Sequence, residues 1–498
     1  MEPDATPQRQ DVGGEQLEPD PRRWRALLVL GLIHFMLVLD VTVVNVALPR
    51  IQQELGFSPA GLAWVVNGYV IMAGGLLLLG GRIADIYGRR RMFMVGVALF
   101  ALASAVCGAA FNAEMMVIGR FVQGVGEALA APASLGLITL LFRDPGERAK
   151  AYGIWGGLTS LAGIGGVVIS GALVDLASWR WIFFINLPIA VLGLVMVVRL
   201  VAESKMVRDG SRPHFAGALI GTAGLVAIVY GLLQAAEHAW GSWSVLGPLL
   251  GGVVLLAVMV FVESRSTAPL IPLSFFANRT RVTANVVSVF FGAGFYSQVF
   301  LMSLFLQQVL GYTPLQGGLA GVPSGVAMVL GIGLGSGLIT KLGARTVMTV
   351  SFFGSAAGLL LLSGLEVDST FIGGVLPGTF LLGLFTGFGM PAILGAALHE
   401  VTEQDSSLGS GVQDTMAQVG TALGLAFLVT FALRHANNEI GAGVPVNVAA
   451  TDGYTMAFQI AAGLFALSGV LALLLLEKVQ VTGPGGEGGP GVERQPAA

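Results

Sequence analysis

The stretch Gly81–Arg91, with the sequence GRIADIYGRRR, decides how this chain folds. It follows an apolar run at 61–80 and precedes another at 92–111. An apolar run of about 20 residues is long enough to cross the hydrocarbon core of a bilayer as a helix. The stretch carries four arginines, and Lys and Arg accumulate in cytoplasmic loops. It therefore predicts two membrane-spanning helices joined by a cytoplasmic loop.

The composition extends this prediction to the whole chain. Hydrophobic residues make up 54% and charged residues 11% of the 498 residues, against about 25% charged residues in ordinary soluble domains. The polar ends, 1–24 and 479–498, are predicted to be disordered. Fourteen spans are predicted, at 26–48, 61–80, 92–111, 115–141, 150–173, 182–200, 215–234, 245–262, 282–307, 315–339, 346–364, 371–397, 407–432 and 456–476.

The placement of basic residues supports this count. With fourteen spans, both ends of the chain and every second loop lie on one side of the membrane. Of the 26 Lys and Arg residues, all but four fall on that side, the exceptions being Arg50, Arg120, Arg180 and Arg434. Such a bias predicts a multi-pass protein of the plasma membrane with both termini in the cytoplasm.

The chain also contains an internal repeat. The sequence QQELGFSP at 52–59 returns as QQVLGYTP at 307–314, and the same offset carries Gly88 onto Gly343. Spans one to three thus correspond to spans nine to eleven. This predicts an all-α membrane protein with an N-terminal six-helix bundle at 25–201, a linker with two additional helices at 202–264 and a C-terminal six-helix bundle at 265–478. Paired bundles with a binding site between them are a recurrent transporter design.

Four motifs resemble those of the fourteen-helix drug/proton antiporters of the major facilitator superfamily. Gly81–Arg91 resembles motif A, and Leu39–Pro49 (LDVTVVNVALP) resembles the first-helix signature. Arg120–Gly126 (RFVQGVG) resembles motif B, and Ser178–Pro188 (SWRWIFFINLP) is typical of the sixth helix. The resemblance covers about 26–476 and implies the major facilitator fold and proton-coupled efflux of drugs by alternating access.

A fifth motif departs from the family. Antiporter motif C usually carries Gly-Pro followed by a Gly-Gly pair, whereas this chain has Val167 in place of the proline and Ser170 in place of one glycine. The bend of a proline is lost, but small residues that permit close helix packing remain. The predicted packing glycines are Gly124, Gly163, Gly166 and Gly171.

Three carboxylates lie inside predicted spans, where an ionisable group is costly unless it is paired or hydrated. Asp40, Glu127 and Asp414 are therefore candidates for proton coupling or recognition of cations. Each has a structural alternative: Asp40 as a hydrogen-bonded carboxylate, Glu127 as the partner of a basic or amide group, Asp414 as part of a solvated helix start. The resemblance implies that Arg120 influences proton uptake by a neighbouring carboxylate.

Other polar residues have less specific roles. Gly81, Asp85, Gly88, Arg89 and Arg90 are predicted to gate the conformational change, with topology control by positive charge as the alternative. Neutral or weakly basic side chains are candidates for the cavity wall, although His34 is more readily explained by packing. The cavity candidates are His34, Asn45, Asn67, Tyr69, Gln123, Asn285, Tyr296, Gln298, Gln413 and Gln418.

These features predict a proton-driven exporter of small, lipophilic or cationic organic compounds. We find no Walker A, HExxH or CxxC sequence, and expect no catalytic residues, no metal site and no cofactor beyond the proton gradient. The expected partners are a small-molecule substrate, protons and the bilayer, without nucleic acid, for a bacterial monomer. A dedicated exporter of one natural product or metabolite and a passive facilitator are the alternatives, and a non-transporting sensor would not need the three carboxylates.

Overall fold

The computed structural model describes residues 21–142, 144–203, 215–266, 269–401 and 406–477. Within these ranges every regular element is helical, and thirteen helices are long and apolar enough to cross a membrane. The all-α prediction is confirmed. The tails predicted to be disordered lie outside the described residues, except for 21–24. The first helices are α1 (Arg23–Leu55), α2 (Ala63–Tyr87), α3 (Arg89–Gly108), α4 (Ala113–Leu141), α5 (Pro145–Leu176), α6 (Trp181–Phe184) and α7 (Asn186–Leu200).

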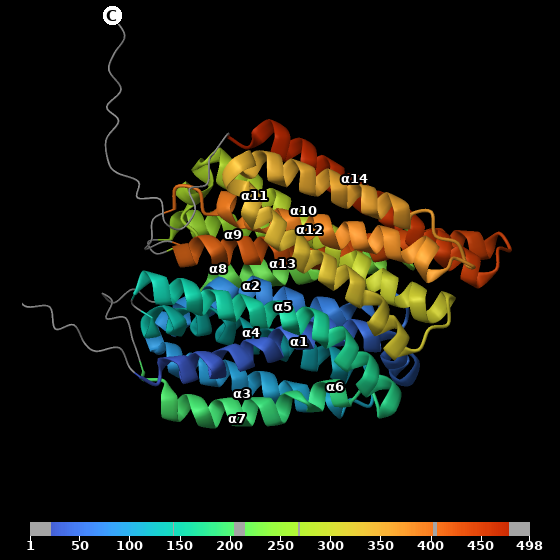
Figure 1. The fold of residues 1–498 in the computed structure, drawn as a ribbon. Helices are drawn as coiled ribbons and strands as arrows, with labels where there is room; N and C mark the ends of the chain where they lie inside the picture. The colour runs from blue at the N-terminus through green and yellow to red at the C-terminus, as the bar shows by residue number, and fades with distance from the viewer. Residues whose placement is uncertain (1–20, 143, 204–214, 267–268, 402–405, 478–498) are drawn as a thin grey trace, which may run out of the picture.

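The remaining elements complete the chain. They are α8 (Phe215–Gln234), α9 (Trp243–Arg265), the short turn η1 (Leu273–Ala277), α10 (Arg279–Leu304), η2 (Phe305–Val309), α11 (Pro314–Leu362), η3 (Phe371–Val375), α12 (Leu376–Ala397), α13 (Ser406–Gly441) and α14 (Val446–Leu475). Helices α1 to α7 lie together in the lower part of Figure 1, and α10 to α14 lie in the upper part. The limits predicted for the three parts remain a prediction, because 204–214 and 267–268 at their boundaries lie outside the described residues.

The repeat appears in the backbone conformation. Gly56 and Gly311, the fifth residues of the repeated octapeptides, have the same left-handed conformation, with φ of 69° and 70°. Gly88 and Gly343, which the repeat places at equivalent positions, also have positive φ, at 109° and 76°. Glycine is favoured at all four because it lacks the Cβ that penalises positive φ.

Helix α11 accounts for the difference between thirteen helices and fourteen predicted spans. Its 49 residues are continuous except for the non-helical backbone of Gly343. Before this break, Gly331 and Gly335 face Leu384 and Phe388 of α12; after it, Gly354 and Gly358 face Phe385 and Leu382. The first arm thus runs parallel to α12 and the second antiparallel, so the chain reverses at Gly343. The predicted spans 315–339 and 346–364 correspond to these two arms.

The last two helices extend beyond their predicted spans. Helix α13 continues to Gly441 instead of 432, and α14 begins at Val446 instead of 456. The predictions followed the apolar runs, whereas the helices continue into polar sequence. There Arg434 donates to the backbone oxygens of Ala235 (2.7 Å) and His238 (2.8 Å).

The two halves present the same ends of their helices to one side. Helices α1 and α10 run parallel, because Ser303 and Gln308 of the second half bond to Asn45 and Gln52 of the first, in that order. Arg279 at the start of α10 bonds to Leu474 at the end of α14. The start of α1 and the end of α14 therefore lie on one side, which we call the terminal face. It is the left side of Figure 1.

Candidate functional site

A buried polar network surrounds Asp40 in the middle of α1. The carboxylate pairs with the guanidinium of Arg120 on α4. It also accepts hydrogen bonds from Gln123 on α4 (Nε2 to Oδ1, 3.1 Å) and from Asn186 at the start of α7 (Nδ2 to Oδ1, 2.9 Å). Ser104 of α3 accepts from both amides, at 2.8 and 3.3 Å. Four helices thus contribute to the surroundings of one carboxylate.

Arg120 is held from several directions. Its Nε donates to the backbone oxygen of Val65 on α2 (2.8 Å), and its Nη1 also donates to Gln123 Oε1 (2.9 Å). The guanidinium lies over the ring of Tyr69, with its central carbon 4.3 Å from the ring centroid. The side chains of Arg120 and Asp40 are only 1% and 0% exposed. Burying two charges is tolerated here because each is paired and further hydrogen-bonded.

Glu127 and Asp414 occupy a different environment. Glu127 lies at the middle of α4 and is partly exposed, while Asp414 on α13 is exposed. Asp414 is the ninth residue of its helix, about 12 Å from the helix start at 1.5 Å per residue. Both carboxylates nevertheless interact electrostatically with each other and with Tyr296 of α10. Because their charges interact, Glu127 and Asp414 lie near each other on helices of the two halves, with one oxygen of the Glu127 carboxylate buried. We call the space between the two halves at this level the central cavity.

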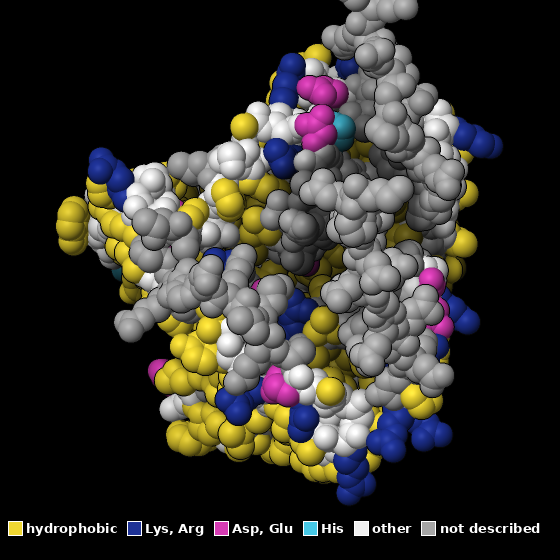
Figure 2. All heavy atoms as spheres, turned by 90° about the vertical axis from the view of Figure 1, so that its left-hand side faces the viewer, with side chains coloured by type: hydrophobic (Ala, Val, Ile, Leu, Met, Phe, Trp, Pro, Cys, Tyr) yellow, Lys and Arg dark blue, Asp and Glu magenta, His cyan; other side chains and the backbone are white. Residues whose placement is uncertain are grey.

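The cavity is closed on the side opposite the terminal face. Ser303 Oγ donates to Asn45 O (2.6 Å), and Gln307 Nε2 donates to Val46 O (2.9 Å), which joins the end of α10 to α1. The backbone N–H of Leu315, at the start of α11, donates to Asp175 at the end of α5 (2.9 Å). The terminal face, in contrast, is hollowed near its centre (Figure 2). This conformation is therefore open toward the terminal face.

The motif A loop is ordered by local contacts. Arg89 pairs with Asp85 one turn before it (2.8 Å) and donates through Nη1 to the backbone oxygen of Gly136 on α4 (3.0 Å). Glu203, which follows α7, accepts the backbone N–H groups of Arg90 (3.2 Å) and Arg91 (3.1 Å) at the start of α3. A carboxylate is favourable there because helix N-termini carry unsatisfied N–H groups. The predicted role of these residues in gating the conformational change stays a prediction.

The predicted cavity residues divide into two groups. Tyr296, Gln413 and Gln418 are partly exposed, as cavity walls require. The other predicted members are buried in this conformation, and their assignment to the cavity wall stays a prediction. Their side chains pack inside the helix bundles: Tyr69 and Gln123 surround Arg120, Asn45 and Asn285 bond to their own helices, and His34 stacks on Trp155 at 3.8 Å between centroids. The buried group is His34, Asn45, Asn67, Tyr69, Gln123, Asn285 and Gln298.

The predicted packing glycines also divide. A Cβ on Gly124 would stand 2.8 Å from Met72 Cβ of α2, and one on Gly171 would stand 2.6 Å from Leu315 Cα of α11. Gly166 lies against Thr42 of α1. Gly163 differs, because no described atom lies within 4 Å of its Cβ position. The expected close packing is therefore absent at Gly163.

Sequence reasoning missed three side chains of these networks, namely Ser104, Asn186 and Glu203. Asn186 lies inside the sixth-helix motif, but nothing in the sequence shows that its amide reaches Asp40, which is 146 positions away. Glu203 lies in a polar segment without any motif.

For metal ions, the described part of the chain holds no group of three or more His, Cys, Asp or Glu side chains that could bind one.

Comparison with known proteins assigns the fold and the motifs to one family. The sequence profile of the Major Facilitator Superfamily matches residues 30–425 and 284–497. The chain belongs to the Major Facilitator Superfamily. Like other members of this superfamily, it folds as a multi-pass helical protein, and it has close bacterial relatives.

Two relatives and one solved structure illustrate the match. The puromycin resistance protein pur8 of Streptomyces alboniger is 36% identical over 92% of both chains. The cephamycin export protein CmcT of Amycolatopsis lactamdurans is 35% identical over 81% of this chain and 84% of its own. A bacterial homologue of the human lysosomal transporter Spinster, in an inward-facing and unoccupied conformation, has a TM-score of 0.66 at 17% identity, over 92% of this chain and 97% of that one. At this identity the likeness concerns the fold.

Proposed function

We propose that this chain exports small organic compounds of the antibiotic type from the cytoplasm in exchange for protons. The observation that carries the proposal is the pair of carboxylates Glu127, which is partly exposed, and Asp414, which is exposed, whose charges interact between the two halves. A cavity lined by two acids favours lipophilic cations, because an organic cation and a proton compete for the same negative charge. The named relatives, which confer resistance to puromycin or export cephamycin, support a substrate of this class.

The transport cycle follows from the difference between the buried Asp40–Arg120 pair and the acids Glu127 and Asp414. A cationic substrate enters the cavity from the terminal face, which we place in the cytoplasm, and neutralises Glu127 and Asp414. Protons taken up from the opposite side displace the substrate there. Each ligand shifts the equilibrium by its differential affinity for the two conformations. Moving one charge through a membrane potential of 100 mV supplies about 2.3 kcal/mol. A single proton can therefore drive export of the substrate against its concentration gradient.

The Asp40–Arg120 pair has a separate role in this scheme. Both side chains are sealed from the cavity in the described conformation, so a proton reaches Asp40 only when the surrounding helices move. Protonation of Asp40 would leave the Arg120 charge uncompensated, which favours a conformation that hydrates or re-pairs the guanidinium. We assign this pair to conversion between states, and Glu127 and Asp414 to substrate and proton binding.

The test is transport in proteoliposomes with an imposed pH gradient. We expect a lipophilic cationic dye to move in the direction that the gradient drives, and Glu127→Gln to lose this movement. Glu237→Gln is the control, because Glu237 is an exposed acid outside the cavity. Dye movement that ignores the pH gradient would indicate a passive facilitator and contradict proton exchange.

A dedicated exporter of one natural product is the second candidate. It is favoured by relatives whose names each specify a single antibiotic. Competition between structurally unrelated compounds separates the two candidates. A polyspecific exporter shows mutual inhibition among many lipophilic cations, whereas a dedicated exporter responds to one compound class.

We further propose that the protein acts as a monomer in the plasma membrane, with both termini in the cytoplasm.

A further inference from the structure

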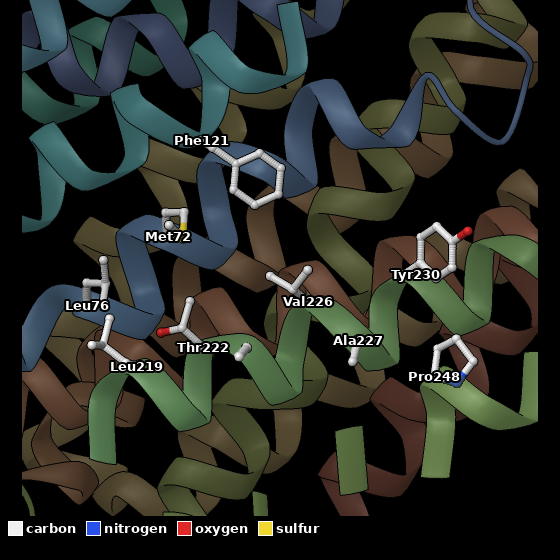
Figure 3. Close-up of a pocket in the computed structure, with 10 residues that line it drawn as sticks. Met72, Leu76, Phe121, Leu219, Thr222, Val226, Ala227, Tyr230 and Pro248 are labelled. Carbon is white, nitrogen blue, oxygen red and sulfur yellow. The ribbon is translucent and has the colours of Figure 1, made fainter. Parts of the chain in front are cut away.

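An apolar groove lies on the outside of the helix bundle, away from the central cavity. It separates α2 and α4 from the inserted helices α8 and α9 and has a volume of about 460 Å³ (Figure 3). Helix α8 supplies one wall with residues that recur at helical spacing. The lining consists of Met72, Leu76, Phe121, Leu219, Thr222, Ala223, Val226, Ala227, Tyr230 and Pro248.

The dimensions of the groove match part of a bilayer leaflet. Its wall on α8 runs from Leu219 to Tyr230, which is about 16 Å at 1.5 Å per residue. This is roughly half of the 30 Å hydrocarbon core. The groove is elongated along the helix axes, so an occupant lies parallel to the membrane-spanning helices.

The two ends and the open side of the groove differ. Toward the terminal face, the packed side chains of Leu76, Leu79, Ala128 and Ala218 close it. Leu219, next to this closed end, is 56% exposed, and Tyr230 at the other end is 45% exposed. The groove is therefore continuous with the apolar surface that α8 and α9 present to lipid.

The groove presents almost no polar group that an occupant would have to hydrogen-bond. The hydroxyl of Thr222 donates to Ala218 O (2.8 Å). The hydroxyl of Tyr230 accepts from Gln234 Nε2 (3.0 Å) and lies at the open end. The Tyr230 hydroxyl can in turn donate a hydrogen bond to an ester or headgroup oxygen at this end. An occupant is therefore an apolar chain with a polar group next to Tyr230.

Helix α2 separates this groove from the central cavity. Two adjacent glycines make the separation thin: a Cβ on Gly74 would stand 2.6 Å from Gln418 Cβ of α13, and Gly75 faces Thr222 of α8 on the other side. A molecule in the groove is thus outside the route between Glu127 and Asp414. The groove is a binding site that differs from the transport site.

We propose that this groove binds one acyl chain of a membrane lipid from the leaflet opposite the terminal face. Inside a bilayer the gain comes from dispersion contacts, which an empty groove of this size forfeits. The chain would connect α8 and α9 to α2 and α4. This connection would help to hold α9 against the bundle, because the described residues of α9 include only Val245 and Gly252 as buried positions.

The experiment uses the full-length protein in nanodiscs that contain a phospholipid with a photoreactive diazirine in the middle of one acyl chain. After irradiation, mass spectrometry of peptides locates the labels. We expect labelling of Met72 and Leu76, which lie behind α8. Ala227→Trp places an indole in the groove and should remove most of this labelling, whereas Ala257→Trp, at an exposed position of α9 outside the groove, should retain it.

Two outcomes would overturn the proposal. Labels spread evenly over the exposed residues of α3 and α9, and unchanged in Ala227→Trp, would indicate ordinary surrounding lipid. Labels absent from Met72 and Leu76, while other lipid-facing residues are labelled, would show that no acyl chain occupies the groove. Val226→Phe is the smaller second variant if Ala227→Trp does not fold, as judged by size-exclusion chromatography. The readout involves no transport, so it is independent of the proposed export activity.

Discussion

The guanidinium of Arg120 on α4 and the carboxylate of Asp40 on α1 form an ion pair from which solvent is excluded. Gln123 bonds to both members, and Asn186 bonds to Asp40 from a third helix. A pair with this many partners is rigid while both charges are present. When one charge is removed, the other stays buried without compensation, which destabilises the packing around it. We therefore expect protonation of Asp40 to change the packing of several helices.

Removing one charge of this pair should destabilise the fold more than removing both. Asp40→Asn leaves the Arg120 charge buried without compensation, a change worth about 3–5 kcal/mol. We expect the double variant Asp40→Asn/Arg120→Gln to recover part of that loss. Unfolding of the purified protein in detergent measures both variants and Arg120→Gln alone. Additive losses in the double variant would show that the two charges do not depend on each other.

Loss of the Asp414 charge should change the selectivity for substrate charge. Asp414 is exposed in the cavity and faces Glu127. In Asp414→Asn we expect weaker transport of lipophilic cations and little change for neutral lipophilic compounds, because only the cation loses a charge–charge attraction. Proteoliposome transport of one dye of each kind measures the ratio. An equal loss for both dyes would indicate damage to packing and not to charge recognition.

The contact between α5 and α11 should control closure on the side opposite the terminal face. A Cβ at Gly318 would stand 3.0 Å from the backbone carbon of Val167, with its oxygen closer still. Gly318→Ala should therefore force the two helices apart and favour a conformation open on that side. Gly321→Ala is the matched control, because its Cβ would meet only the end of the Val167 side chain, at 3.7 Å.

Chemical cross-linking between cysteines at two facing positions measures this closure. Gln308 Nε2 donates to Gln52 Oε1 (2.9 Å) across the closed side. In a background without Cys107, the variant Gln52→Cys/Gln308→Cys should be linked readily by a short bismaleimide, which replaces the length of the two glutamine side chains. We expect the yield to fall with Gly318→Ala and to hold with Gly321→Ala. The same yield in both would contradict a role of this contact in closure.

The motif A loop should require arginine, not merely a positive charge, at position 89. Arg89 contacts the Asp85 carboxylate and the Gly136 carbonyl at once, and a lysine ammonium lacks the planar fork that makes this possible. We expect Arg89→Lys to lose most transport while the protein still inserts in the membrane with the same topology. Arg91→Lys, at an exposed position, should transport normally. Normal transport by Arg89→Lys would reduce the role of this residue to topology.

The sequence was a good guide to features that depend on local composition. The apolar runs predicted the spans because the bilayer selects for length and hydrophobicity along the chain. The octapeptide repeat predicted that Gly88 and Gly343 are equivalent, and both residues have the positive φ that a sharp reversal needs. The helix limits were less accurate where a helix leaves the hydrocarbon, as at Val446, because polar residues continue the helix without an apolar signal.

From hydrophobicity, charge bias and repeats, which are read one residue after another, the sequence alone predicts a helical membrane protein with two related halves. Only the tertiary structure decided which carboxylates are sealed and which are accessible. Asp40 and Glu127 are both acids inside apolar helices, yet one meets Arg120 from 80 positions away and the other faces the cavity. Pairing and exposure depend on contacts between helices that are distant in the sequence, and no linear pattern records those contacts.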